Sequence, residues 1–123
     1  TCQRSLVEPA TVAFPEKSKV DEQYVAQAKR LLKSGNYPAI ATQDDKIIKE
    51  LCNFVESNQI DKSGFEFQML LGIRRDLQNS LVKDGYNVRI YVPYGDQWYP
   101  YFTRRLAERP ANAFFIIKNL FKN

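Results

Sequence analysis

Short runs of alternating residues and longer runs with helical periodicity follow one another along this chain, and this alternation constrains its fold most. Strands are expected at residues 37–42, 65–70 and 87–92. Helices are expected at about residues 20–35, 45–55, 73–85 and 97–108. Strands that alternate with helices in this way are typical of βαβ units, whose strands are parallel. The sequence therefore predicts an α/β fold with about three parallel strands.

The ends of the helices carry recognisable signals. Asp21 is expected to cap the first helix, which begins near Val20, and Gly35 to end it. Asp44 and Asp45 are interpreted as charges that favour the start of the second helix, in preference to a metal site. The expected apolar stripes of the first three helices are Tyr24, Val25, Ala28, Leu31 and Leu32; Ile47, Ile48, Leu51, Cys52 and Val55; and Leu77, Leu81 and Val82.

Residue parity within the strands predicts a sheet with two unlike faces. Glu66 and Gln68 alternate with apolar residues in the second strand, as Arg89 and Tyr91 do in the third. A doubly wound sheet would be apolar on both faces, so this pattern favours a barrel wall with helices outside and a ligand site inside. Three strands are too few to close a barrel. Either a second copy completes the sheet, or the chain is the C-terminal piece of a larger barrel, the interpretation that we favour.

Composition excludes several kinds of chemistry. The 123 residues contain no histidine and two cysteines, which removes Ser-His-Asp catalysis and most zinc sites. Cys52 lies in an apolar stripe and is expected to be a reduced, buried thiol, as in a cytoplasmic protein. With 44% hydrophobic residues the chain can form a core, and its apolar runs are too short for a membrane-spanning helix.

The net charge of +4 comes entirely from the second half of the chain. Residues 1–60 hold 8 basic and 8 acidic side chains, whereas residues 61–123 hold 10 basic and 6 acidic ones. The basic residues of the second half are mostly arginine and are dispersed, unlike the clusters of a nucleic-acid-binding surface. Arginine suits carboxylates and phosphates, so an anionic small molecule is the expected ligand and nucleic acid is not.

Several segments in a fixed order resemble the C-terminal portion of proline dehydrogenases. They are Glu8–Pro15, Ala39–Thr42, Phe65–Leu70, Val88–Gly95, Trp98–Tyr101 and Arg104–Asn112. The resemblance implies that residues 1–123 are one partial domain, strands six to eight of a (β/α)₈ TIM barrel. It also implies that the parent enzyme oxidises L-proline to Δ1-pyrroline-5-carboxylate, with hydride transfer to FAD. The isolated chain is then expected to be inactive, because the other strands are needed for a complete site.

The resemblance assigns a substrate site to six residues, namely Leu70, Tyr91, Tyr101, Arg104, Arg105 and Glu108. Arg104 and Arg105 would grip the carboxylate of proline, and Glu108 would orient them. Without the resemblance, the spacing of the same arginines favours a solvated helix face. Tyr101 and Leu70 are likewise compatible with ordinary packing.

The resemblance assigns flavin contacts to Thr42 and Gln43, although the family pattern has histidine where this chain has Gln43. A threonine at a strand end is also compatible with simple capping of the following turn. No side chain is expected to act as an acid, base or nucleophile, because the cofactor carries out hydride chemistry.

Partners and location follow from the resemblance as further expectations. The electron acceptor would be a quinone or another oxidant, and the parent enzyme would be a cytoplasmic protein that contacts a membrane peripherally. The fragment itself is expected to self-associate. The alternative function is a non-enzymatic, self-associating α/β module that binds an anionic small ligand.

Overall fold

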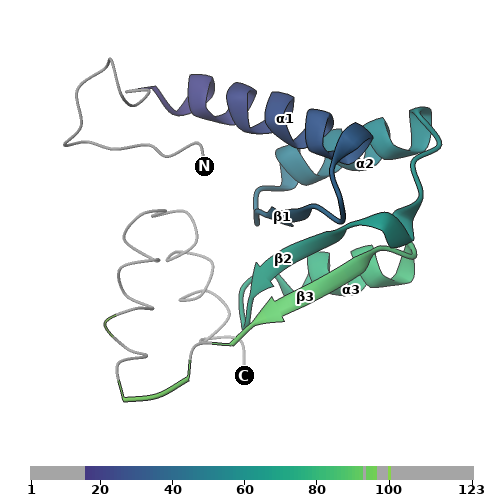
Figure 1. Ribbon diagram of the computed structural model, residues 1–123. Helices are drawn as coiled ribbons and strands as arrows, with labels where there is room; N and C mark the ends of the chain where they lie inside the picture. Colours follow the sequence, from purple (N-terminus) through teal and green to yellow (C-terminus); the bar gives the residue numbers. More distant parts are fainter. Residues whose placement is uncertain (1–15, 93, 97–99, 101–123) are drawn as a thin grey trace.

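The computed structural model describes residues 16–92, 94–96 and 100. The elements follow in the order α1 (Lys17–Ser34), β1 (Ala39–Ala41), α2 (Asp45–Ser57), η1 (Lys62–Gly64), β2 (Glu66–Leu70), α3 (Arg75–Lys83) and β3 (Asn87–Tyr91). The strands form one parallel sheet in the order β1-β2-β3 (Figure 1). The prediction of an α/β fold with three parallel strands is confirmed. The helix expected at residues 97–108 lies outside the described residues, except for Pro100.

The core lies between one face of the sheet and the three helices. Phe65, Phe67 and Met69, on that face, are at most 2% exposed. Ile40 of β1 joins them, and the helices contribute Val25, Ala28, Leu32, Ile47, Ile48, Leu51, Val55 and Leu81. Among the described residues, no helix is long and apolar enough to cross a membrane. The apolar residues of β2 thus pack against the helices, and the polar residues that alternate with them lie on the other face of the sheet.

Helix α1 begins one turn earlier than predicted. Its first residue is Lys17, and Glu16 occupies the N-cap position with extended backbone and no capping hydrogen bond from its side chain. Asp21 therefore lies within the helix, where it pairs with Lys17, and does not cap it. Lys17 also lies 3.5 Å from Asp44 at the start of α2. An attraction between residues four apart stabilises this additional turn, which the stripe of apolar residues alone does not indicate.

Gly35 ends α1 as predicted. Glycine is needed there because the backbone is crowded, and not because it is left-handed. Its φ is −79°, which any residue can adopt. Its N–H donates to the Leu31 carbonyl oxygen at 2.6 Å. A Cβ on Gly35 would lie 2.5 Å from that oxygen, so the close approach of the backbone requires glycine.

Strand β1 is shorter than predicted, because the backbone of Tyr37 is not extended. Tyr37, expected to begin the strand, has a left-handed backbone with φ of 50°. This conformation is uncommon for a residue with a side chain. The regular strand consequently spans only Ala39–Ala41. The expected strand at 65–70 and the helix start at Asp44 agree with the structure, where the Asp44 carboxylate accepts from the Lys46 N–H at 3.0 Å.

Two residues of the predicted apolar stripes are exposed. Leu31 of α1 is 48% exposed and Val82 of α3 is 59% exposed. Gln78 is buried instead on α3, and its amide donates to the carbonyls of Leu70 and Ile73 at 3.0 and 2.8 Å. These bonds satisfy a buried amide and tie the start of α3 to the end of β2. The helical periodicity of a short segment does not reveal that a polar residue is buried in place of an apolar one.

Cys52 is less enclosed than predicted. It is free and half-buried beside the core, and burial raises the pKa of its thiol above the ordinary value. The Cys52 thiol lies beside the Tyr86 hydroxyl, which has no conventional hydrogen-bond partner among the described residues. A thiol of raised pKa is mostly protonated at neutral pH, so Cys52 serves as a packing residue.

Candidate functional site

The face of the sheet opposite the helices carries its side chains in three rows. Strand register pairs Glu66 with Ala39 and Asn87 in the row nearest the start of the strands. The other two rows are Ala41, Gln68 and Arg89, and then Leu70 and Tyr91 at the carboxyl ends of β2 and β3. Residues in register on parallel strands project to the same side of a sheet. The predicted polar face is therefore confirmed. Its first row contains the charged residue Glu66, and its last row, at the carboxyl ends of the strands, contains Leu70 and Tyr91.

Glu66 is the centre of a hydrogen-bond network on this face. Its two carboxylate oxygens accept from Arg89 Nε at 2.6 Å and Arg89 Nη2 at 2.8 Å. Gln68 Nε2 donates to it at 2.8 Å, and the Tyr37 hydroxyl approaches it at 3.5 Å. The Arg89 guanidinium, followed by the Gln68 amide, lowers the pKa of Glu66 to about 2. Glu66 is thus a fixed anion, although its side chain is only 7% exposed.

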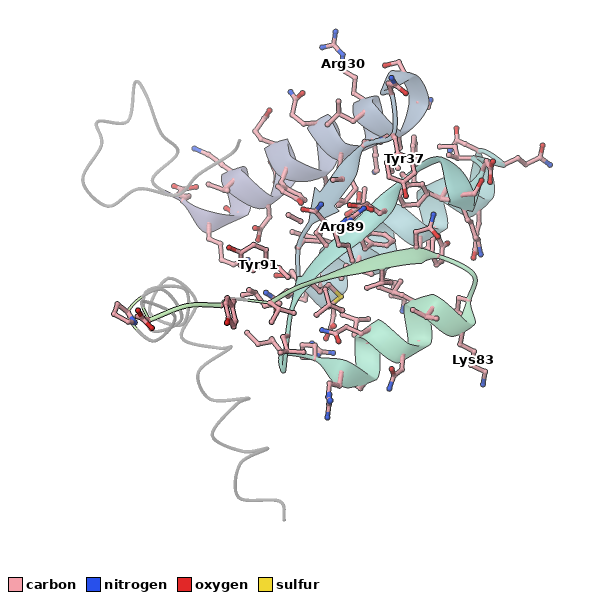
Figure 2. All side chains as sticks on the ribbon, turned by 60° about the horizontal axis from the view of Figure 1, so that its bottom comes forward. Arg30, Tyr37, Lys83, Arg89 and Tyr91 are labelled. Atoms are coloured by element: carbon pink, nitrogen blue, oxygen red, sulfur yellow. The ribbon has the colours of Figure 1, made fainter. Side chains whose placement is uncertain are left out.

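The left-handed backbone of Tyr37 takes part in this arrangement. Ala39 and Ala41 put only methyl groups on the polar face of β1, which leaves room beside Glu66. In Figure 2, Arg89 lies between Tyr37 and Tyr91 along the sheet, whereas Lys83 belongs to α3. Tyr37, Arg89 and Tyr91 therefore follow one another across the sheet, from the start of β1 to the carboxyl end of β3.

Leu70 and Tyr91 are the predicted substrate-site residues that the structure brings together. They are register partners on β2 and β3. Leu70 is half-buried and Tyr91 is 52% exposed, so both offer surface at the carboxyl edge of the sheet. This is the edge where (β/α)₈ barrels hold their active sites. Tyr101, Arg104, Arg105 and Glu108, the other predicted substrate residues, lie outside the described residues.

Thr42 and Gln43 follow β1 at the same edge. Thr42 is buried, and its hydroxyl oxygen accepts from the Asp44 N–H at 3.3 Å, as expected of a residue that caps a turn. The Gln43 side-chain oxygen is buried and has no hydrogen-bond partner among the described residues. A buried acceptor without a donor is unfavourable, so a bound group with an N–H or O–H would complete it. The ribityl hydroxyls and ring N–H of a flavin provide such donors, so the residues fit this group.

Sequence reasoning placed Glu66, Gln68 and Arg89 on the polar face but did not identify their network. Opposite charges at matching parity on consecutive strands were the available signal for the pair of Glu66 and Arg89. Tyr37 gave no such signal, because its side chain reaches Glu66 only through a left-handed backbone.

Comparison with known proteins adds the family to this geometry. The family model described as proline dehydrogenase matches residues 4–118. The chain belongs to the proline dehydrogenase family. It is 52% identical over 116 residues to a proline dehydrogenase of Deinococcus radiodurans, which covers 94% of this chain and 37% of that protein. It is also 52% identical over 115 residues to proline dehydrogenases 1 and 2 of Bacillus subtilis strain 168, covering 38% of each.

The chain thus spans a little over a third of the length of the proline dehydrogenases that it matches. Three parallel strands, with helices packed on one face, are consistent with the C-terminal part of a larger barrel. Proline dehydrogenases are oxidoreductases and are generally flavin-dependent.

Proposed function

We propose that this chain is the C-terminal part of an FAD-dependent proline dehydrogenase, which oxidises L-proline to Δ1-pyrroline-5-carboxylate. The family match over residues 4–118 carries the proposal. The structure supports it with the pair of Leu70 and Tyr91 at the carboxyl edge of the sheet. The family match also favours this enzyme over a non-enzymatic module that binds an anion.

The residues of this chain would bind and orient the substrate. Leu70 and Tyr91 would form one wall of the proline pocket, while Arg104 and Arg105 would bind the carboxylate. A pair of arginine forks fixes a carboxylate in position and direction, so that the ring carbon next to nitrogen faces the cofactor. Tyr101 would pack on the proline ring, and Glu108 would orient the arginines.

The flavin, when bound, accepts the hydride that proline loses. Thr42 and Gln43 would hold it, with the Gln43 amide oxygen accepting a hydrogen bond from one of its donors. The proline nitrogen would release a proton to water as the carbon–nitrogen double bond forms, so that the hydride and this proton account for both hydrogens lost in the oxidation. A quinone or another electron acceptor would then reoxidise the flavin.

The proposal extends to assembly and location. Within the described residues β1 and β3 each have a single strand neighbour, and open strand edges favour pairing with further strands. This supports self-association of the isolated chain. The free, protonated thiol of Cys52 supports a cytoplasmic location, and the family resemblance supports peripheral contact of the whole enzyme with a membrane.

A chimeric enzyme tests the proposed function. In this chimera, the chain replaces the matching 115 residues of Bacillus subtilis proline dehydrogenase 1. Proline should bleach the absorbance of the bound flavin and yield Δ1-pyrroline-5-carboxylate, as it does in the unsubstituted relative run in parallel. A chimera that binds flavin and leaves proline unoxidised would overturn the proposal.

A pair of tyrosine variants tests the site within the chimera. Tyr91→Phe should raise the KM for proline about two- to tenfold, the effect of one lost hydrogen bond from the hydroxyl. Tyr94→Phe is the matched control, because Tyr94 is fully exposed and near Tyr91 in sequence. Equal kinetics in the two variants would remove Tyr91 from the substrate pocket.

A further inference from the structure

Arg89 lies close beneath the proposed substrate site. It precedes Tyr91 by two residues on the same face of β3, a separation of about 7 Å along the strand. A guanidinium at that distance has the reach and the geometry to bind a carboxylate with two hydrogen bonds. In a site that binds the carboxylate of proline, an unrestrained Arg89 would compete with the proper partners of the substrate.

The structure shows where the hydrogen bonds of Arg89 are directed. Nε and Nη2 of Arg89 donate to Glu66, which stands one row nearer the start of the strands than Arg89. The Arg89 side chain is 65% exposed, whereas that of Glu66 is 7% exposed. Packing within the described residues therefore holds Arg89 only loosely, and Glu66 supplies its restraint.

Glu66 is itself held in place from two sides. Gln68 Nε2 donates to Oε1 from the row of Arg89, and the Tyr37 hydroxyl approaches Oε2 from the start of β1. These contacts orient the carboxylate independently of Arg89. The left-handed backbone of Tyr37 is the cost of bringing its phenol to this position.

We propose that Glu66 is a positioning residue, which holds the Arg89 guanidinium below the substrate row and away from the substrate carboxylate. The inference rests on the proposed function, since that function places the carboxylate at this edge. The intact pair carries no net charge, so it neither attracts nor repels the anionic substrate. Loss of either partner leaves one charge beneath the site, and the sign depends on which partner is lost.

A positioning role predicts that the two single variants change inhibition by acetate in opposite directions, whereas a merely structural role does not. In the chimeric enzyme, Glu66→Gln frees a cation, so inhibition by acetate should become roughly fivefold stronger and kcat should fall through unproductive binding of proline. Arg89→Gln leaves an anion, so inhibition by acetate should weaken and the KM for proline should rise by about the same factor. The double variant E66Q/R89Q carries neither charge and should return both values toward those of the unsubstituted chimera.

Glu50→Gln is the control for loss of one carboxylate. Glu50 lies 2.6 Å from Lys29 in an ion pair between α1 and α2, on the helical side of the sheet. The Glu50→Gln substitution removes the same charge far from the polar face, so the response to acetate should be unchanged. Changes of the same sign in E66Q and R89Q, or a double variant worse than either single one, would overturn the positioning role.

Stabilisation by acetate, measured as the shift in Tm against sodium chloride of equal ionic strength, provides a readout that needs no turnover. If the chimera fails to oxidise proline yet E66Q and R89Q shift this stabilisation in opposite directions, the proposed function fails and the role of Glu66 toward a bound carboxylate stands. If proline is oxidised and the shifts are alike, the role of Glu66 fails alone.

Discussion

Glu66 and Arg89 join the first row of β2 to the second row of β3 through two hydrogen bonds, of 2.6 and 2.8 Å. A diagonal pair of this kind favours the observed register of the two parallel strands, because a slip by one residue would put one partner on the opposite face. It also brings opposite charges together on the face of the sheet that none of the described helices covers.

Acid should weaken the folded chain through Glu66. Its pKa is lowered from 4.5 to about 2, chiefly by Arg89. A carboxyl with a lowered pKa stabilises the fold above its ordinary pKa, and that stabilisation is lost as the pH falls through the folded value. The free energy of unfolding, measured by urea titration, should therefore decrease between about pH 4.5 and pH 2.

Glu66→Gln should flatten this decrease, since glutamine does not titrate. Glu50→Gln, which removes a carboxylate from a more exposed ion pair, serves as the comparison. Identical acid dependence in the two variants would exclude Glu66 as the source of the effect.

Gly35→Ala should destabilise the chain by about 1–3 kcal/mol, as other steric substitutions in packed positions do. The added Cβ would lie 2.5 Å from the Leu31 carbonyl oxygen, so the end of α1 must shift. Gly64→Ala is the control, because nothing lies within 4 Å of a Cβ there. Urea unfolding midpoints of the two variants measure the difference, and similar midpoints would contradict the steric explanation.

Phe67→Ala should destabilise the chain by about 3–5 kcal/mol. Phe67 is fully buried, and its ring packs edge-on against Phe65 and Tyr86 at centroid distances of 5.5 and 5.7 Å. Leu71→Ala, at a residue 47% exposed, should change the free energy of unfolding by no more than about 0.5 kcal/mol. Equal losses, measured by chemical denaturation, would contradict the assignment of the core to this face.

Arg104→Lys and Arg105→Lys should each raise the KM for proline in the chimeric enzyme, with little effect on folding. Lysine keeps the charge and loses the two-pronged hydrogen bonding to a carboxylate, at a cost of about 1–3 kcal/mol in binding. Arg75→Lys, at an exposed residue of α3, is the control. Unchanged proline kinetics in both variants would reject the two arginines as the carboxylate clamp.

The local pattern of the sequence determined the elements and their faces. Alternation in residues 65–70 separates Phe65 and Phe67 from Glu66 and Gln68, and the structure keeps that separation. Asp44 likewise marks the start of α2 by a bond to a residue two positions away. Such features depend on neighbours in the chain, so composition and spacing contain them. The same holds for Leu70 and Tyr91, whose parity and place at strand ends predicted their common edge.

Only the tertiary structure decided which distant groups meet. Glu66 and Arg89 are 23 residues apart, and their contact depends on the register between β2 and β3, which parity limits to alternate residues without fixing it. Tyr37 reaches Glu66 through a backbone that propensity disfavours, and Gly35 is required by an approach to the Leu31 carbonyl oxygen. Local geometry sets the face on which a side chain lies, whereas packing of whole elements sets its partner.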